Sequence, residues 1–203
     1  MNKAVLPRLG AASGAVFAIV LFVAAGNGDE SFSTPRAIAG VAAITLALPF
    51  VGYLSRLLRE AEGANGWLAT AALAGGTIGI GLKLVSVVPE LTIHRAHVAD
   101  GTQLHKAFQQ MADGTTVLSL YPLAVFCAAT AIVALRTRVL PRWLGAGAAV
   151  TAAALAVNGG FLEASFVPAL LLFIVWTLVA SIYLVRRGSR TTARVSGEAT
   201  AAA

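Results

Sequence analysis

Charged side chains are scarce in this sequence. Asp, Glu, Lys and Arg make up 12% of the 203 residues, whereas 58% are hydrophobic and the mean hydropathy is +0.80. An ordinary soluble domain carries about twice that share of charge. The charged residues also stand between long apolar runs instead of being interspersed with them. This composition excludes a typical soluble globular protein and predicts a chain whose solvent is lipid.

Cysteine is rare, and recognisable reaction motifs are absent. Cys127 is the only cysteine, which excludes an intrachain disulfide, and it lies in an apolar run where a small buried residue is expected. The sequence contains no Walker loop, dinucleotide-binding glycine motif, GxSxG elbow or CxxC pair. It therefore indicates no enzymatic reaction, and no cofactor is predicted.

Long apolar runs are what the sequence has in abundance. Six are long enough to cross about 30 Å of hydrocarbon at about 1.5 Å per helical residue. We predict an all-α polytopic transmembrane helix bundle over residues 1–187 and a disordered cytoplasmic tail over residues 188–203. The expected spans lie near residues 9–26, 37–56, 67–88, 116–135, 143–161 and 166–185.

The first run ends in Ala24-Ala25-Gly26, as a cleaved signal peptide would. Five further spans follow it, and Gly10 and Gly14 give it a face suited to close helix packing, so an uncleaved helix is the preferred interpretation. The alternative of cleavage stays open.

The net charge of +6 is distributed unevenly between the two sides of the predicted bundle. Positively charged connections stay in the cytoplasm, and this rule places both termini there. The same rule accounts for the net positive charge, so the charge does not require a nucleic acid as a partner. Membrane lipids are the expected partners. The connections on the basic side contain Lys3, Arg8, Arg56, Arg59, Arg136, Arg138, Arg142, Arg186, Arg187, Arg190 and Arg194, and the other side has only Arg36, Arg95 and Lys106.

Three polar residues near the outer ends of the spans are candidates for a ligand or ion pathway. Lys83 is the one charged residue well inside a predicted span, and such residues are functional candidates when they do not reach water. Its long side chain is expected to extend to the outer surface or to pair with Glu163. Asn158 lies about one helical turn before Glu163 and would join the same outer cavity.

All three histidines lie in the connection between the third and fourth spans. Glu90, His94 and His97 would share an arc of about 60° if this stretch is helical, and His105 could complete a metal shell. Zinc or a similar divalent ion suits these ligands, but the spacing is not the HExxH of a zinc protease. Solvated histidines in a loop are the preferred interpretation.

The same connection carries a second helical pattern. From Thr102 onward, Leu104, Phe108 and Met111 follow helical spacing and predict a short amphipathic helix on the outer bilayer surface that stops near Gly114. In the third span, Gly75 and Gly79 form a GxxxG pair. Packing inside the bundle is the preferred role of that face, and a homo-oligomer is the alternative.

One segment of the chain resembles a known family. The resemblance rests on Leu104-His105-Lys106-Ala107-Phe108, Leu120-Tyr121-Pro122-Leu123-Ala124-Val125-Phe126, Ala134-Leu135-Arg136-Thr137 and Leu140-Pro141-Arg142-Trp143-Leu144-Gly145. In these residues the chain is similar to a family of small, uncharacterised six-helix integral membrane proteins of actinobacteria. The resemblance implies a multi-pass protein of the bacterial plasma membrane, and it implies no catalytic residues.

The sequence thus indicates an integral membrane protein that binds a small ligand, supports transport or acts as an accessory protein. Two alternatives remain open. One is a metal-dependent membrane enzyme with an outward-facing site on Glu90, His94 and His97. The other is a structural or partner-binding subunit that uses the Gly75–Gly79 face.

Overall fold

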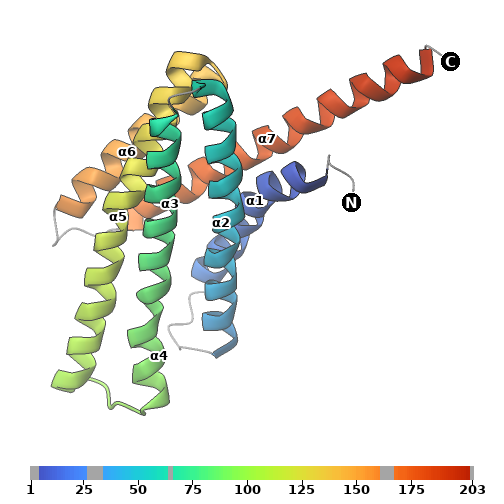
Figure 1. Cartoon of the computed structure of the whole chain (residues 1–203). Helices are drawn as coiled ribbons and strands as arrows, with labels where there is room; N and C mark the ends of the chain where they lie inside the picture. The colour runs from blue at the N-terminus through green and yellow to red at the C-terminus, as the bar shows by residue number, and fades with distance from the viewer. Residues whose placement is uncertain (1–4, 27–33, 64–65, 161–166, 202–203) are drawn as a thin grey trace.

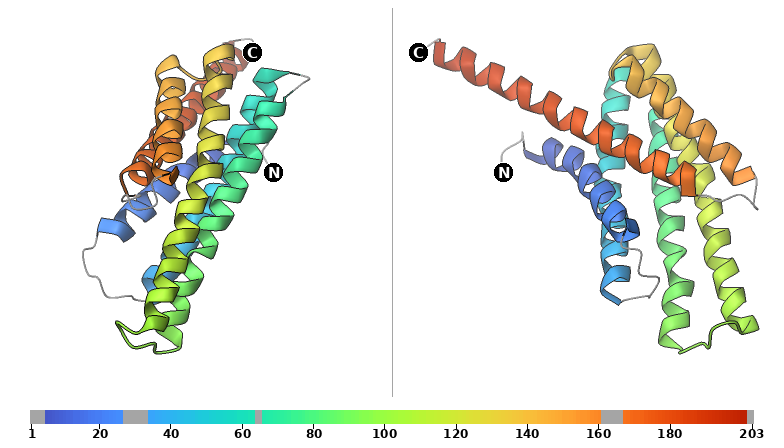
Figure 2. Two further views of the ribbon diagram at one scale, coloured as in Figure 1. Left: turned by 90° about the vertical axis from the view of Figure 1, so that its left-hand side faces the viewer. Right: turned by 180° about the vertical axis from the view of Figure 1, so that it is seen from behind.

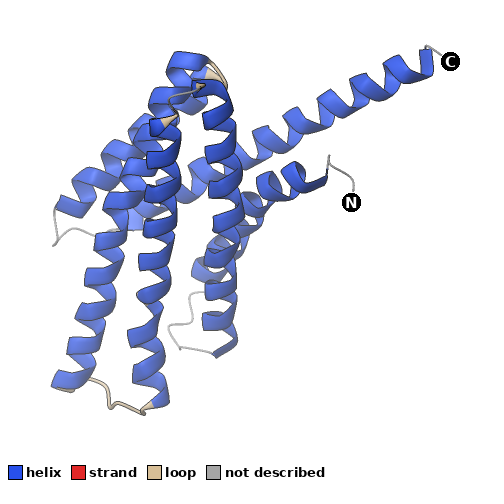
Figure 3. Ribbon diagram, in the orientation of Figure 1, coloured by secondary structure: helices blue, strands red, loops and turns tan. Residues whose placement is uncertain are grey.

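The computed structural model describes residues 5–26, 34–63, 66–160 and 167–201. All regular structure in this part of the chain is helical, which confirms the prediction of an all-α protein (Figure 3). A helix satisfies its own backbone hydrogen bonds, as a segment inside hydrocarbon must. The helices are α1 (Val5–Gly26), α2 (Thr34–Glu62), α3 (Trp67–Val85), α4 (Val87–Arg95), α5 (Gln103–Thr137), α6 (Arg142–Gly160) and α7 (Val167–Ala201).

Five helical segments are long and apolar enough to cross a membrane. They are Ile38–Glu62, Trp67–Arg95, Gln103–Thr137, Arg142–Gly160 and Pro168–Arg187. α3 and α4 together form the second of these, with only Ser86 between them. In α1 the apolar helix Leu9–Val23 is shorter than the other five, so a sixth crossing stays a prediction.

α5 occupies the middle of the molecule. It packs against α3 on one side and α6 on the other, and α2 packs on the far side of α3 (Figure 1). α1 contacts α2 and α7, and both α1 and α7 run obliquely to the other helices (Figure 2). The buried ring of Phe126 on α5 meets Phe173 and Trp176 of α7 edge to face, with ring centroids 6.4 and 6.1 Å apart. These contacts join α5 to α7.

Glycines let α3 approach α5 and α2 closely. A Cβ atom added at Gly75 would lie 2.6 Å from the Pro122 carbonyl oxygen, and one at Gly79 would lie 2.7 Å from Leu123. A Cβ at Gly76 would lie 2.6 Å from Val51 of α2. The GxxxG face is thus covered by helices of the same chain, in agreement with the preferred interpretation of the sequence. A homo-oligomer stays a prediction.

The prediction of a separate helix lying on the outer surface was wrong. α5 is continuous from Gln103 to Thr137 and passes through Gly114 without a stop. The physical reason is tertiary, since α4 packs beside this part of α5 and supports it as a helix. With 35 residues, α5 is about 52 Å long, well beyond the hydrocarbon thickness. The α4 and α5 ends project together past α2 and α6 (Figure 1).

At the carboxyl end, α7 extends to Ala201. This part of α7 leads away from the other helices (Figure 2). The disordered tail expected over residues 188–203 stays a prediction.

Candidate functional site

Lys83 is positioned by the end of α3 and by the break that follows it. Pro89 has no N–H, so it cannot donate to the carbonyl of Val85, where α3 ends. The Ser86 hydroxyl donates to the Lys83 carbonyl oxygen at 2.8 Å. α4 begins at Val87 and continues beside α5. Lys83 thus lies in the last turn of α3, on the side that faces α5.

The side chain of Lys83 reaches across to α5. Its Nζ donates to Thr116 Oγ1 at 2.9 Å, and Thr116 is buried whereas Lys83 is half-buried. The ammonium group also interacts electrostatically with Glu90 of α4 and Asp113 of α5, both exposed. We refer to Lys83, Glu90, Asp113 and Thr116 as the Lys83 cluster. It connects α3, α4 and α5. It lies near the base of the projecting hairpin, which is formed by α4, the turn after it and the first part of α5.

The depth of the cluster follows from helix geometry. Lys83 lies 16 residues after Trp67, or about 24 Å along the helix axis, which is less than the hydrocarbon thickness of about 30 Å. Glu90 lies about 10 Å further along the same side of the helix. If the hydrocarbon starts at Trp67, the cluster would span its opposite boundary, where charge interactions are stronger than in bulk water.

Part of this cluster follows from helical spacing in the sequence. Lys83 and Glu90 are seven residues apart, which places them on one helical face about two turns from each other. Asp113 and Thr116 are three residues apart on α5 and share a face in the same way. Their proximity to Lys83 depends on how α3 pairs with α5, and sequence spacing does not reveal that pairing.

The pairing of Lys83 with Glu163 stays a prediction, because Glu163 lies outside the described residues. Asn158 is half-buried on α6. α5 lies between α6 and α3, so Asn158 and Lys83 approach α5 from different helices (Figure 1). Tyr121 of α5 donates to the Gly159 carbonyl oxygen at 2.8 Å and ties α6 to α5 next to Asn158.

The proposed metal ligands are distributed over the hairpin. α4 ends at Arg95, and His97 has a left-handed backbone with φ of 48°, so His97 does not continue the helical face of Glu90 and His94. Glu90 lies within electrostatic range of Lys83 at the end of α3. In the described part of the chain, no three His, Cys, Asp or Glu side chains gather as a metal site would require. Zinc binding stays a prediction, and the described residues do not provide a set of ligands for it.

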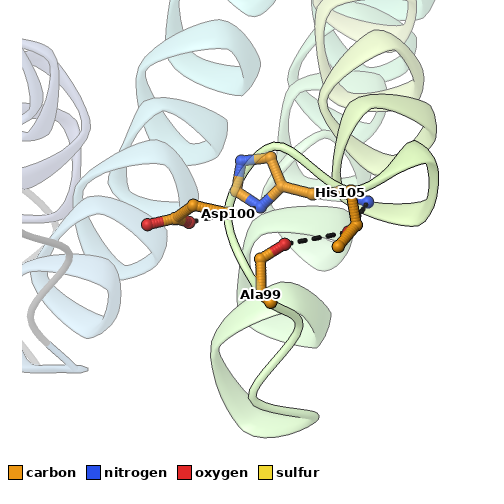
Figure 4. A network of polar contacts seen from close by, with 4 residues as sticks. Ala99, Asp100 and His105 are labelled. Atoms are coloured by element: carbon orange, nitrogen blue, oxygen red, sulfur yellow. Dashed lines mark hydrogen bonds and ion pairs between the residues drawn. The ribbon is translucent and has the colours of Figure 1, made fainter.

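His105 takes part in closing the hairpin. Its backbone N–H donates to Thr102 Oγ1 at 3.2 Å, and Thr102 Oγ1 donates to the Ala99 carbonyl oxygen at 2.8 Å (Figure 4). The ring Nδ1 lies 3.5 Å from Asp100 Oδ1. Thr102 is the N-cap of α5, so these bonds satisfy a free amide at the start of that helix. This geometry gives His105 a structural role in the turn.

Comparisons with known proteins were made for the whole chain. No family model matches it, and no curated protein and no solved structure is similar to it.

Proposed function

We propose that this chain is a multi-pass protein of a bacterial plasma membrane that binds a small cationic ligand at the outer end of the α3, α4 and α5 helices. The single observation that carries the proposal is the Lys83 cluster. Five long apolar helical segments support the membrane setting. The bacterial plasma membrane comes from the resemblance of segments within residues 104–145 to small actinobacterial membrane proteins.

The charge of the cluster supports a cation as the ligand. Two carboxylates, Glu90 and Asp113, lie within electrostatic range of one ammonium group, so the cluster has a formal charge of −1. Ionisable groups within a membrane-spanning region are costly and typically mark ion or substrate pathways. A small monocation, inorganic or a primary amine, would compensate the excess charge. Lys83 then acts as an internal competitor for the same carboxylates.

Thermal unfolding of the detergent-purified protein tests this proposal. Methylammonium chloride is titrated against N-methylglucamine chloride at equal ionic strength, because N-methylglucamine is a much bulkier cation of the same charge. We expect methylammonium to raise the melting temperature by about 3–5 °C at ten times its dissociation constant. Asp113→Asn should abolish the rise, since it removes the excess charge.

Two further variants separate binding from folding. Lys83→Met removes the internal competitor, so the half-maximal rise should occur at a lower methylammonium concentration than in the unmodified protein. Lys106→Met and Asp100→Asn are matched controls, because both residues are exposed on the same hairpin outside the cluster. An equal rise in Asp113→Asn, or no rise in the unmodified protein, would contradict the proposal.

A further inference from the structure

The end of the bundle that contains the α5–α6 turn carries a concentration of arginine. We propose that this end binds the phosphate of an anionic phospholipid in the cytoplasmic leaflet. The inference rests on the proposed membrane topology and not on the Lys83 cluster. We refer to the five exposed arginines there as the arginine patch, which consists of Arg136, Arg138, Arg142, Arg186 and Arg187.

Three helices bring the arginine patch together. α5 ends at Thr137, and Arg138 adopts a left-handed backbone (φ 56°) in which its N–H donates to the Ala134 carbonyl oxygen at 3.0 Å. This cap turns the chain sharply, and α6 begins at Arg142. From α7, the Arg187 guanidinium donates to the Val139 carbonyl oxygen in the turn. That bond fixes the end of the α7 membrane segment against the α5–α6 turn.

The segments that carry the patch contain no acidic residue. Residues 128–160 and 167–187, which contain the turn and the adjoining parts of α5, α6 and α7, include no Asp or Glu. Five guanidinium groups at one end of three packed helices repel one another unless anions bind. Guanidinium groups match the geometry of phosphate oxygens and bind them in a bidentate manner.

The neighbouring α2–α3 turn on the same predicted membrane side provides an internal comparison. There Arg56 forms an ion pair with Glu60 (Nε to Oε1, 2.9 Å), and Arg59 donates to Thr70 Oγ1 at 2.9 Å. Glu62 accepts the backbone N–H groups of Leu68 and Ala69 at 3.2 and 3.0 Å. Two arginines and two glutamates thus balance in charge at that turn. An anion is drawn to the α5–α6 turn and not to the α2–α3 turn.

An aromatic pair beside the patch favours a lipid over a free phosphate ion. Trp143 of α6 and Tyr183 of α7 meet edge to face, with ring centroids 6.4 Å apart, and Trp143 is 58% exposed. Aromatic side chains of this kind lie at the headgroup level of a bilayer, next to the upper acyl chains. The arginines would hold the phosphate while the rings contact the glycerol and acyl region. Basic clusters at the cytoplasmic ends of membrane helices bind anionic headgroups in this way.

Native mass spectrometry of the full chain in detergent tests the inference. The probes are phosphatidylglycerol, phosphatidylcholine and inorganic phosphate. We expect phosphatidylglycerol to bind more tightly than phosphatidylcholine, and Arg138→Gln/Arg142→Gln to weaken phosphatidylglycerol binding about tenfold. Arg56→Gln/Arg59→Gln is the matched control, because it removes the same charge from the same side and should change binding by less than about twofold.

Folding is monitored by size-exclusion chromatography and circular dichroism. Arg136→Gln/Arg186→Gln provides a second test variant that leaves the Arg187 bond to the turn intact, and it should weaken binding in the same direction. An equal loss in the control double variant would overturn the site in favour of general charge attraction. Displacement of the lipid by millimolar inorganic phosphate would overturn the lipid as the ligand. Lys83→Met should bind phosphatidylglycerol normally, which separates this site from the Lys83 cluster.

Discussion

At the scale of single residues, two glycines of α3 determine how closely α3 approaches α5 and therefore where Lys83 lies. Gly75 and Gly79 bring the backbone of α3 against α5, so that Pro122 and Leu123 occupy the space where side chains would otherwise be. This close approach also places Lys83 within hydrogen-bond distance of Thr116. The glycines near the middle of α3 therefore set the geometry of the charged cluster near its end.

Gly75→Ala should destabilise the protein by about 1–3 kcal/mol, because the new methyl group meets the Pro122 backbone carbonyl, which cannot move independently of α5. Thermal unfolding in detergent measures the change. Gly81→Ala is the matched control on the same helix, since a Cβ there meets nothing within 4 Å. The control should be neutral or stabilising by up to about 1 kcal/mol, because alanine favours the helix. Equal destabilisation by both changes would contradict the packing described for α3 and α5.

At the scale of elements, the α3–α4 and α5 pair is the distinctive feature. The amphipathic pattern of Leu104, Phe108 and Met111 is real, but in the structure it belongs to a helix that continues out of the bundle and packs beside α4. Met111 and Leu104 remain exposed on the projection. The two arrangements, a helix lying on the bilayer and one projecting from it, differ in whether Met111 faces lipid or water.

Cysteine labelling distinguishes these two arrangements. In a Cys127→Ala background, Met111→Cys should react with a membrane-impermeant maleimide added outside the cell, because the projecting helix exposes this position to water. Lys106→Cys should react in either arrangement and serves as the positive control. Val125→Cys, which is exposed on the part of α5 expected in hydrocarbon, should not react. An unreactive Met111→Cys together with a reactive Lys106→Cys would restore the surface-lying helix.

At the scale of the whole molecule, charge and helix length together define two ends. One end contains the arginine patch and the balanced α2–α3 turn, and the opposite end contains the projecting hairpin with its histidines (Figure 1). The uneven distribution of Lys and Arg predicts that the first end is cytoplasmic. The proposed cation site and lipid site would then lie on opposite faces of the membrane.

Reporter fusions test this orientation. Alkaline phosphatase inserted after Asp100 should be active, and the same insertion after Arg138 should be inactive, because the enzyme folds only outside the cytoplasm. Green fluorescent protein fused to the carboxyl terminus should fluoresce. The reverse pattern would invert the orientation, and recovery of the chain in the supernatant after detergent-free ultracentrifugation would remove the membrane setting altogether.

The sequence by itself determined the helical class and the positions of the long apolar segments, because these depend on local composition and on the need of a helix to satisfy its own backbone. It also singled out Lys83 as a charged residue within an apolar run. Only the tertiary structure decided that Thr116 accepts a hydrogen bond from Lys83 with Asp113 in electrostatic range, that the Gly75–Gly79 face is covered by α5, and that His97 leaves the face of His94. Such contacts join residues distant in the chain, and their free energy depends on which helices pair. The local pattern of a single helix does not contain that information.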